Sequence, residues 1–151
     1  RNLDTMLRRA LGMVVRIVGA EAGSILVQTQ STHRVRSGAF RQEALTRIDH
    51  WEAVISRRLQ DTVLTIPLAA NLPISITKLN GSQLALVNLP LLQDNKVIGS
   101  LILVLSPGQE LADPQQNLLT RIAKGMGQMA SLVSDLELAQ QRLNPGQRYP
   151  M

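Results

Sequence analysis

The sequence predicts an α+β domain in which an antiparallel sheet is joined to amphipathic helices at both ends of the chain. Residues 84–92 and 96–105 are apolar, flank a polar pair of residues and are typical of a β-hairpin. Near the start of the chain, apolar side chains recur at helical spacing. From Asp113 onward they recur with the seven-residue period of coiled coils. Strands in the middle and helices at the ends indicate one mixed domain.

The size and composition fit a single folded unit. The 151 residues are 44% hydrophobic and 18% charged, and one domain has roughly 100–200 residues. We expect residues 1–143 to form one domain and residues 144–151 to form a flexible tail. The chain begins at Arg1 and enters a helix almost at once, so we expect either a piece of a longer protein or a protein whose leading residues are missing from the sequence. Because it has neither a membrane-spanning apolar run nor a signal-peptide pattern, we expect a cytoplasmic segment without membrane contact.

The composition excludes several kinds of chemistry. The absence of cysteine excludes disulfides, thiolate zinc sites, cysteine nucleophiles and thioether-linked chromophores. The aromatic residues Phe40, Trp51 and Tyr149 are too few to form a stacking surface for single-stranded nucleic acid. The net charge of +5 comes from scattered basic residues without a dense basic face, so nucleic-acid binding remains a third, disfavoured hypothesis.

The first half of the chain predicts a helix, two strands and a second helix. Residues 3–18 form a helix whose apolar face is wide enough for both a sheet and another helix. Residues 24–28 form a strand, and residues 33–39, anchored by Val35, form its exposed antiparallel partner. Asp49 is the expected N-cap of a short helix at residues 51–59, with Glu52 in its first turn. The apolar face of that helix consists of Trp51, Val54, Ile55 and Leu59.

Residues 62–81 allow more than one interpretation. Residues 62–66 are β-branched and predict a short strand. Residues 67–81 have apolar side chains without a clean period, which fits either a short helix or an irregular lid. They either pack on the sheet or line a ligand cavity.

The predicted hairpin has specific local features. Asp94 and Asn95 tolerate the positive φ of a type I′ turn between its strands. Pro90 lacks a ladder donor, so we expect it at an edge or a bulge. Gly99 indicates a bulge or the close approach of another element.

The last helix begins at Asp113 and Pro114 and ends before Asn144. Its heptad positions predict a helix–helix seam, and a second stripe predicts contact with the sheet. Gly125 and Gly127 would allow another backbone to approach closely. The seam comprises Leu119, Ile122, Met126, Met129, Val133, Leu136, Gln140 and Leu143, and the second stripe comprises Leu118, Ala123, Ala130 and Leu132.

Over residues 3–138 this pattern resembles a GAF domain. The strongest likeness is the hairpin at residues 87–104, an apolar-Pro-Leu strand, a turn, and a second strand with an internal Gly. Residues 113–138 are similar to the final helix of the family, and residues 20–24 to its entry into the first strand. The hairpin positions that carry the resemblance are Pro90, Leu91, Val97, Ile98, Gly99 and Leu101.

The resemblance implies a central antiparallel sheet of five or six strands. The N- and C-terminal helices would pack on one face, and loops and short helices would cover the other, where family members hold small ligands. It also implies a homodimer through the terminal helices and an output domain in cis, such as a histidine kinase or a cyclic-dinucleotide enzyme. The chain departs from bilin-binding members because it has no cysteine, and His33 and His50 are better explained as surface or capping residues than as heme ligands. We therefore expect no cofactor, although an unknown small ligand is possible.

We expect a non-catalytic sensory module, because no nucleophile elbow, phosphate-binding loop or zinc-ligand pattern occurs. The alternative is a dimerisation module without a ligand. The expected ligand contacts are mostly apolar, with Arg57 or Arg58 available for an anion: Phe40, Trp51, Ile55, Arg58, Ile66, Leu72, Ile74, Ile76 and Leu89. The expected dimer contacts are Leu3, Leu7, Ala10, Val14, Leu119, Ile122, Met126, Met129, Val133 and Leu136.

Overall fold

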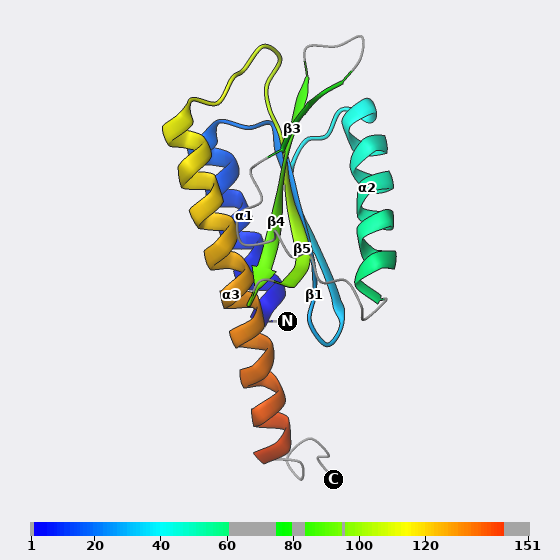
Figure 1. The fold of residues 1–151 in the computed structure, drawn as a ribbon, viewed down its shortest axis with the longest axis vertical. Coiled ribbons are helices and arrows are strands. Elements are labelled where there is room, and N and C mark those ends of the chain that lie inside the picture. Colours follow the sequence, from blue (N-terminus) through cyan, green and yellow to red (C-terminus); the bar gives the residue numbers. More distant parts are fainter. Residues whose placement is uncertain (1, 61–74, 80–83, 95, 144–151) are drawn as a thin grey trace.

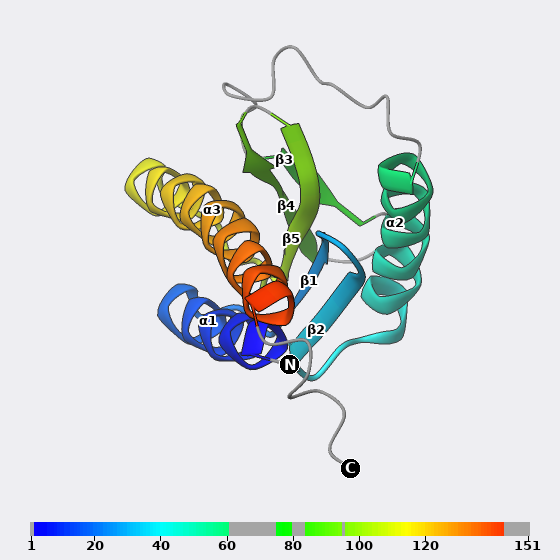
Figure 2. The ribbon, with the colours of Figure 1, turned by 90° about the horizontal axis from the view of Figure 1, so that it is seen from below.

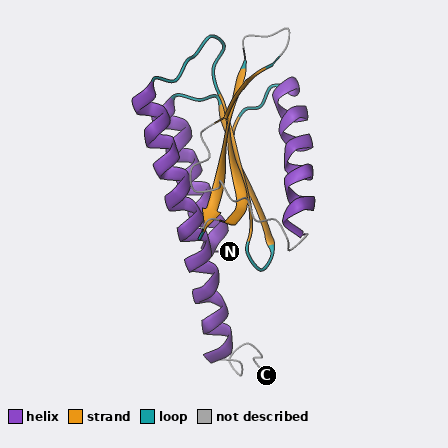
Figure 3. Cartoon of the chain, in the orientation of Figure 1, coloured by secondary structure: helices purple, strands orange, loops and turns teal. Residues whose placement is uncertain are grey.

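The computed structural model describes residues 2–60, 75–79, 84–94 and 96–143. Within them the chain forms helices on both sides of a sheet (Figures 1 and 3). The elements are, in chain order, α1 (Asn2–Val18), β1 (Ala22–Gln28), β2 (Thr32–Gly38), α2 (Gln42–Gln60), β3 (Ser75–Lys78), β4 (Ala85–Gln93), β5 (Lys96–Val104) and α3 (Asp113–Leu143).

Within the described residues the sheet has five strands in the order β2-β1-β5-β4-β3, and every pair of neighbours is antiparallel. β1 and β5 are far apart in sequence but lie side by side at its centre, with Ala22 opposite Val104 and Leu26 opposite Ser100. The α+β class and the strand number predicted from the sequence are therefore confirmed.

One face of the sheet is covered by α1 and α3, as Figure 2 shows from below. Leu7 and Leu11 of α1 and Leu119 of α3 pack in one core with Leu89 and Leu101 of the sheet. Burial of each such side chain contributes about 1.5–3 kcal/mol, so this core is the main source of stability in the described residues. The predicted placement of the terminal helices on one face is confirmed.

The opposite face is covered by α2, and we call it the α2 face (Figure 1). Ala44 and Ile48 of α2 pack there against Ala22, Ile102 and Val104. This core is the smaller of the two among the described residues. The α2 face therefore depends less on apolar packing than the face under α1 and α3.

Local features of the hairpin agree with the sequence. Asp94 has a φ of 50°, as the predicted turn requires. A Cβ at Gly99 would lie 2.0 Å from the backbone oxygen of Leu26, so a side chain cannot fit beside β1. A register shift falls between Leu91 and Leu92, directly after Pro90. The predictions for Pro90, for Gly99 and for the positive φ of Asp94 are confirmed, whereas Asn95, the second turn residue, lies outside the described residues.

The boundaries of α2 correct the sequence prediction. The helix begins at Gln42 instead of residue 51, so Asp49 lies inside the helix and is not an N-cap. In its first turns only Ala44 and Ile48 are buried, so the apolar signal there is weak. The predicted short helices on this face are thus one long helix within the described residues.

The middle of the chain is only partly described. β3 occupies Ser75–Lys78, where the sequence left a short helix or a lid open. The strand predicted at residues 62–66 and most of the segment at 67–81 lie outside the described residues.

Helix α3 starts at Asp113 as predicted, but its apolar stripes are assigned differently. Ala123 and Ala130 face the core as expected. Leu118 and Leu132 were expected to face the sheet but are 42% and 60% exposed, whereas Leu119 and Met126 of the seam are buried. That prediction for Leu118 and Leu132 is wrong, because the seam positions are the ones that turn toward the sheet.

Candidate functional site

Polar side chains gather on the α2 face beyond the small hydrophobic core. Alternate residues of a strand share a face. Ala22 lies in the α2 core, so Ser24, Leu26 and Gln28 project from β1 on the same side. Ser100 of β5 lies opposite Leu26 and beside Pro90 of β4. We call the surface formed by Ser24, Gln28 and Ser100, with the apolar Leu26 and Pro90 between them, the polar half of the α2 face.

Glu52 of α2 is a carboxylate buried against this half of the face, with a relative exposure of 3%. It accepts a hydrogen bond from Ser24 Oγ at 2.5 Å and another from Arg36 Nη2 at 2.9 Å. Arg34 Nη1 of β2 lies 3.8 Å from the same carboxylate. A buried charge is tolerated only when it is paired and hydrogen-bonded, and Glu52 meets both conditions.

Arg36 joins three elements at this point. Its Nη2 also donates to Asp49 Oδ1 at 2.6 Å, and its Nε donates to Ser24 Oγ at 3.2 Å. Burial alone would lower the pKa of Arg36, but the hydrogen bonds to Asp49 and Glu52 raise it above its ordinary value. The guanidinium therefore stays charged and connects β2 to α2 and β1.

The sequence interpretation missed this cluster, since it assigned Asp49 and Glu52 to caps and turns. One signal was present: Arg34 and Arg36 alternate around the apolar Val35, which places both on one face of β2. The carboxylates that pair with them are found only once α2 is known to start at Gln42.

Ser100 carries a hydroxyl without a partner. The residue is 2% exposed, and Oγ makes no hydrogen bond among the described residues. Gln28 Oε1 is also buried and unpaired in this part of the chain. An unsatisfied buried polar group costs about 1–3 kcal/mol, so such groups call for an explanation.

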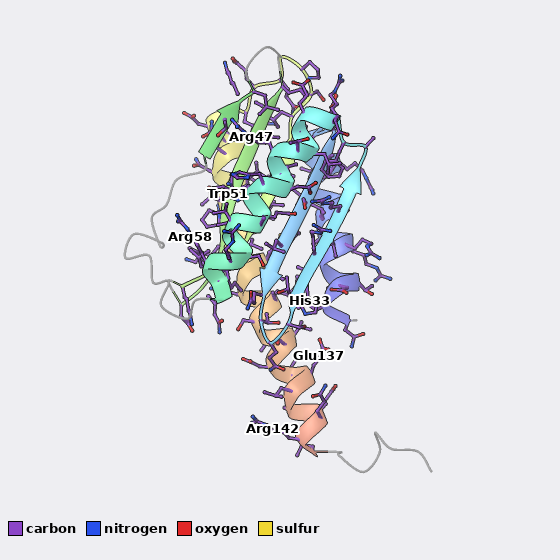
Figure 4. The ribbon with its side chains drawn as sticks, turned by 90° about the vertical axis from the view of Figure 1, so that its right-hand side faces the viewer. His33, Arg47, Trp51, Arg58, Glu137 and Arg142 are labelled. Atoms are coloured by element: carbon purple, nitrogen blue, oxygen red, sulfur yellow. The ribbon has the colours of Figure 1, made fainter. Side chains whose placement is uncertain are left out.

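The structure brings together only some of the predicted ligand contacts. Phe40 packs against the α2 core, and the Cζ atom of Arg36 lies 5.7 Å from the centre of its ring. Ile55 is a buried residue of α2. Trp51 and Arg58 are exposed on one side of α2, together with Arg47 (Figure 4).

Leu89 and Ile76 lie on the opposite face of the sheet from this group. Leu89 belongs to the core under α1 and α3, and Ile76 pairs with Val87 of that same core. Strand alternation thus prevents both from contacting a ligand held under α2. The remaining predicted contacts, Ile66, Leu72 and Ile74, lie outside the described residues.

The predicted dimer contacts divide by burial. Leu3, Leu7, Val14, Leu119 and Met126 are buried in the core, so they are unavailable to a partner in this fold. Ala10, Ile122, Met129 and Val133 are partly buried, and Leu136 is exposed. The apolar residues of these helices that remain exposed are Met13, Ile17, Leu118, Leu132, Leu136 and Leu143.

His33 connects β2 to the start of α1. Its Nδ1 lies 2.7 Å from Asp4 Oδ1, and its Nε2 lies 3.1 Å from Ser31 Oγ. His33 neighbours Arg34 along β2 but points to the other face. The strand is thus attached to α2 through its arginines and to α1 through His33.

Comparison with known proteins identifies the fold. No family model and no curated protein matches the sequence. Solved structures do match: the GAF domain of a Pseudomonas syringae pv. tomato protein assigned as a sensor histidine kinase has a TM-score of 0.61 at 17% identity, over 93% of this chain and 82% of that one. GAF3 of Slr1393 from Synechocystis sp. PCC6803, in its photoproduct state, has a TM-score of 0.63 at 14% identity, over 91% and 99%.

The GAF-B domain of DevS from Mycobacterium smegmatis matches at a TM-score of 0.56 and 18% identity, over 93% of this chain and 98% of that one. The chain therefore has the GAF fold that its hairpin resembles. Among the described residues, no helix is long and apolar enough to span a membrane, and no acidic or histidine cluster could hold a metal ion.

Proposed function

We propose that this domain is a sensory or regulatory module that binds a small molecule on the α2 face. The observation that carries the proposal is the hydroxyl of Ser100, which is buried and has no partner among the described residues. Ser100 lies on the same face of the sheet as Ser24 of the Glu52–Arg36 cluster, on the neighbouring strand and two residues from the partner of Ser24. A ligand that hydrogen-bonds to Ser100 would remove the cost of leaving that group unsatisfied. Ligand pockets are mostly apolar with a few convergent polar groups, and Ser100 has the apolar Leu26 and Pro90 as its partners on the two neighbouring strands.

The bound ligand would act on an output domain in cis, such as a histidine kinase or a cyclic-dinucleotide enzyme. The solved GAF domain from Pseudomonas syringae belongs to a protein assigned to the first of these classes. α2 would change its position on the sheet, and Arg36 and His33 would carry that change through β2 to α1. Such a module is non-catalytic, and we propose a cytoplasmic location for it.

Ligand binding is tested by screening a chemically diverse set of small molecules for compounds that raise the melting temperature. Hits are then mapped by amide chemical shifts. We expect the shifts to concentrate in β1, β5 and the second half of α2. Perturbation confined to α1 and α3, or a screen without any stabilising compound, would contradict the proposal.

The second candidate is a dimerisation module without a ligand. The observation in its favour is the exposed apolar stripe of α3, in which Leu132, Leu136 and Leu143 are 60%, 54% and 78% exposed. The helix projects beyond the sheet at this end (Figure 1). Light scattering on the wild type and on Leu136→Glu tests this candidate, because an exposed position changes association without disturbing the core. A wild type that is monomeric at high micromolar concentration excludes a dimer of this segment.

A further inference from the structure

The ionic groups on the α2 face are already matched with one another. Glu52 is met by Arg36 and lies within reach of Arg34, and Asp49 is met by Arg36. These are two carboxylates and two guanidinium groups, so this cluster has no net charge. A charged ligand would find no free counter-ion in it.

Among the described residues, the buried side-chain groups that have no partner are neutral. They are the hydroxyl of Ser100 and the amide oxygen of Gln28. Both belong to the α2 face, since Ser100 lies opposite Leu26 and Gln28 follows Leu26 by two residues along β1. The hydroxyl can donate and accept a hydrogen bond, whereas the amide oxygen can only accept one.

We infer that the ligand of this site is a small uncharged molecule that accepts a hydrogen bond from Ser100 and donates one to Gln28. Amides, lactams and ureas offer both functions in one neutral group. The inference rests on the proposed function and specifies the ligand class of the same site.

The two charged alternatives are disfavoured by their surroundings. An anion at Ser100 would share the α2 face with the buried carboxylate of Glu52, whose guanidinium partner is already engaged, and Arg57 and Arg58 are exposed to solvent. A cation would compete with Arg36 for Glu52 and would leave that guanidinium without a partner. Burying a charge without its own counter-ion is strongly unfavourable.

Three compounds of similar shape but different charge test the inference. Benzamide, benzoate and benzamidinium share a ring and a planar head group but are neutral, negative and positive. Each is titrated at millimolar concentration into the wild type, Ser100→Ala and Ser131→Ala, with amide chemical shifts as the readout. Ser131 is a buried serine of α3 on the other side of the sheet and provides the matched control.

We expect only benzamide to give saturable shifts at Leu26, Gln28 and Ser100. Binding should weaken about tenfold in Ser100→Ala, the upper range for one hydrogen bond, and should be unchanged in Ser131→Ala. Equal or tighter binding of either charged compound at these amides overturns the ligand class but leaves the proposed function standing. The ligand class is also overturned if benzamide binds Ser100→Ala as tightly as the wild type, or if no member of the series binds. Failure of the wider screen would instead remove the proposed function itself.

Discussion

At the scale of single residues, Ser24 and Ser100 have the same side chain in opposite circumstances. Both are buried on the α2 face and belong to neighbouring central strands. Ser24 Oγ donates to Glu52 and accepts from Arg36, whereas Ser100 Oγ has no partner among the described residues. Their hydroxyls should therefore affect folding and binding in opposite directions.

Ser24→Ala should lower the free energy of unfolding by about 1–3 kcal/mol, because Glu52 would stay buried with one donor fewer. Ser100→Ala should leave the free energy of unfolding unchanged or raise it by about 1 kcal/mol, because the change removes an unsatisfied group. Urea denaturation of the two ligand-free variants measures both effects. A loss of stability in Ser100→Ala as large as in Ser24→Ala would mean that the Ser100 hydroxyl is paired in the folded domain.

The glycines of α3 form a second matched pair at this scale. The sequence suggested that both Gly125 and Gly127 admit a close backbone, but only Gly127 does. A Cβ there would lie 2.3 Å from the backbone oxygen of Leu92, whereas a Cβ at Gly125 would meet nothing within 4 Å.

Gly125→Ala should stabilise the domain by up to about 1 kcal/mol through helix propensity. Gly127→Ala should destabilise it by about 1–3 kcal/mol or more, since α3 must move away from β4. Thermal and urea unfolding of the two variants test the contrast. Equal effects of the two substitutions would show that α3 does not pack on β4 at Gly127.

At the scale of elements, the sequence was most informative where side chains follow one clear period. The hairpin strands and α3 were located closely, because an apolar run, a turn signal and a helix start each leave a local mark. The start of α2 was missed because only Ala44 and Ile48 are buried in its first turns. The Glu52 cluster was missed for a different reason: its members come from three elements, and no local pattern shows that Glu52 lies under the sheet.

β2 is the element that links the two faces. It is an edge strand whose Arg36 binds α2 and whose His33 binds α1. Arg36→Gln should therefore increase amide hydrogen exchange in α2, in β2 and in the first turns of α1. The reason is that Asp49 and Glu52 lose their shared cation and the strand loses its attachment to α2.

Arg41→Gln is the control for this exchange experiment. Arg41 forms a two-bond pair with Glu21 at 2.9 and 3.0 Å, and this pair lowers the pKa of Glu21 chiefly through the hydrogen bond. The pair is exposed and joins neither β2 nor α2 to α1, so α1 should exchange as in the wild type. If Arg36→Gln leaves α1 as protected as Arg41→Gln does, β2 does not connect the two helices.

At the scale of the whole molecule, the two faces of the sheet divide stability and proposed function between them. The face under α1 and α3 is aliphatic, and its core includes half of the residues that the sequence assigned to a dimer. The α2 face combines a small core with paired charges and unpaired hydroxyl and amide groups. The heptad pattern could not separate these uses, because a helix seam and a helix–sheet contact both need apolar residues at the same spacing.

Substitution of seam leucines by alanine should therefore have different effects on stability at different positions along α3. Leu119 is fully buried, so Leu119→Ala should lower the free energy of unfolding by about 2–5 kcal/mol at any protein concentration. Leu136 is 54% exposed, so Leu136→Ala should change the stability of the monomer by less than about 0.5 kcal/mol. If two copies pair through this stripe, the melting temperature of the wild type should rise with protein concentration, and that rise should disappear in Leu136→Ala but persist in Leu119→Ala. Melting curves recorded over a wide range of concentrations measure both quantities, and a large loss of stability in dilute Leu136→Ala would place this leucine in the core instead.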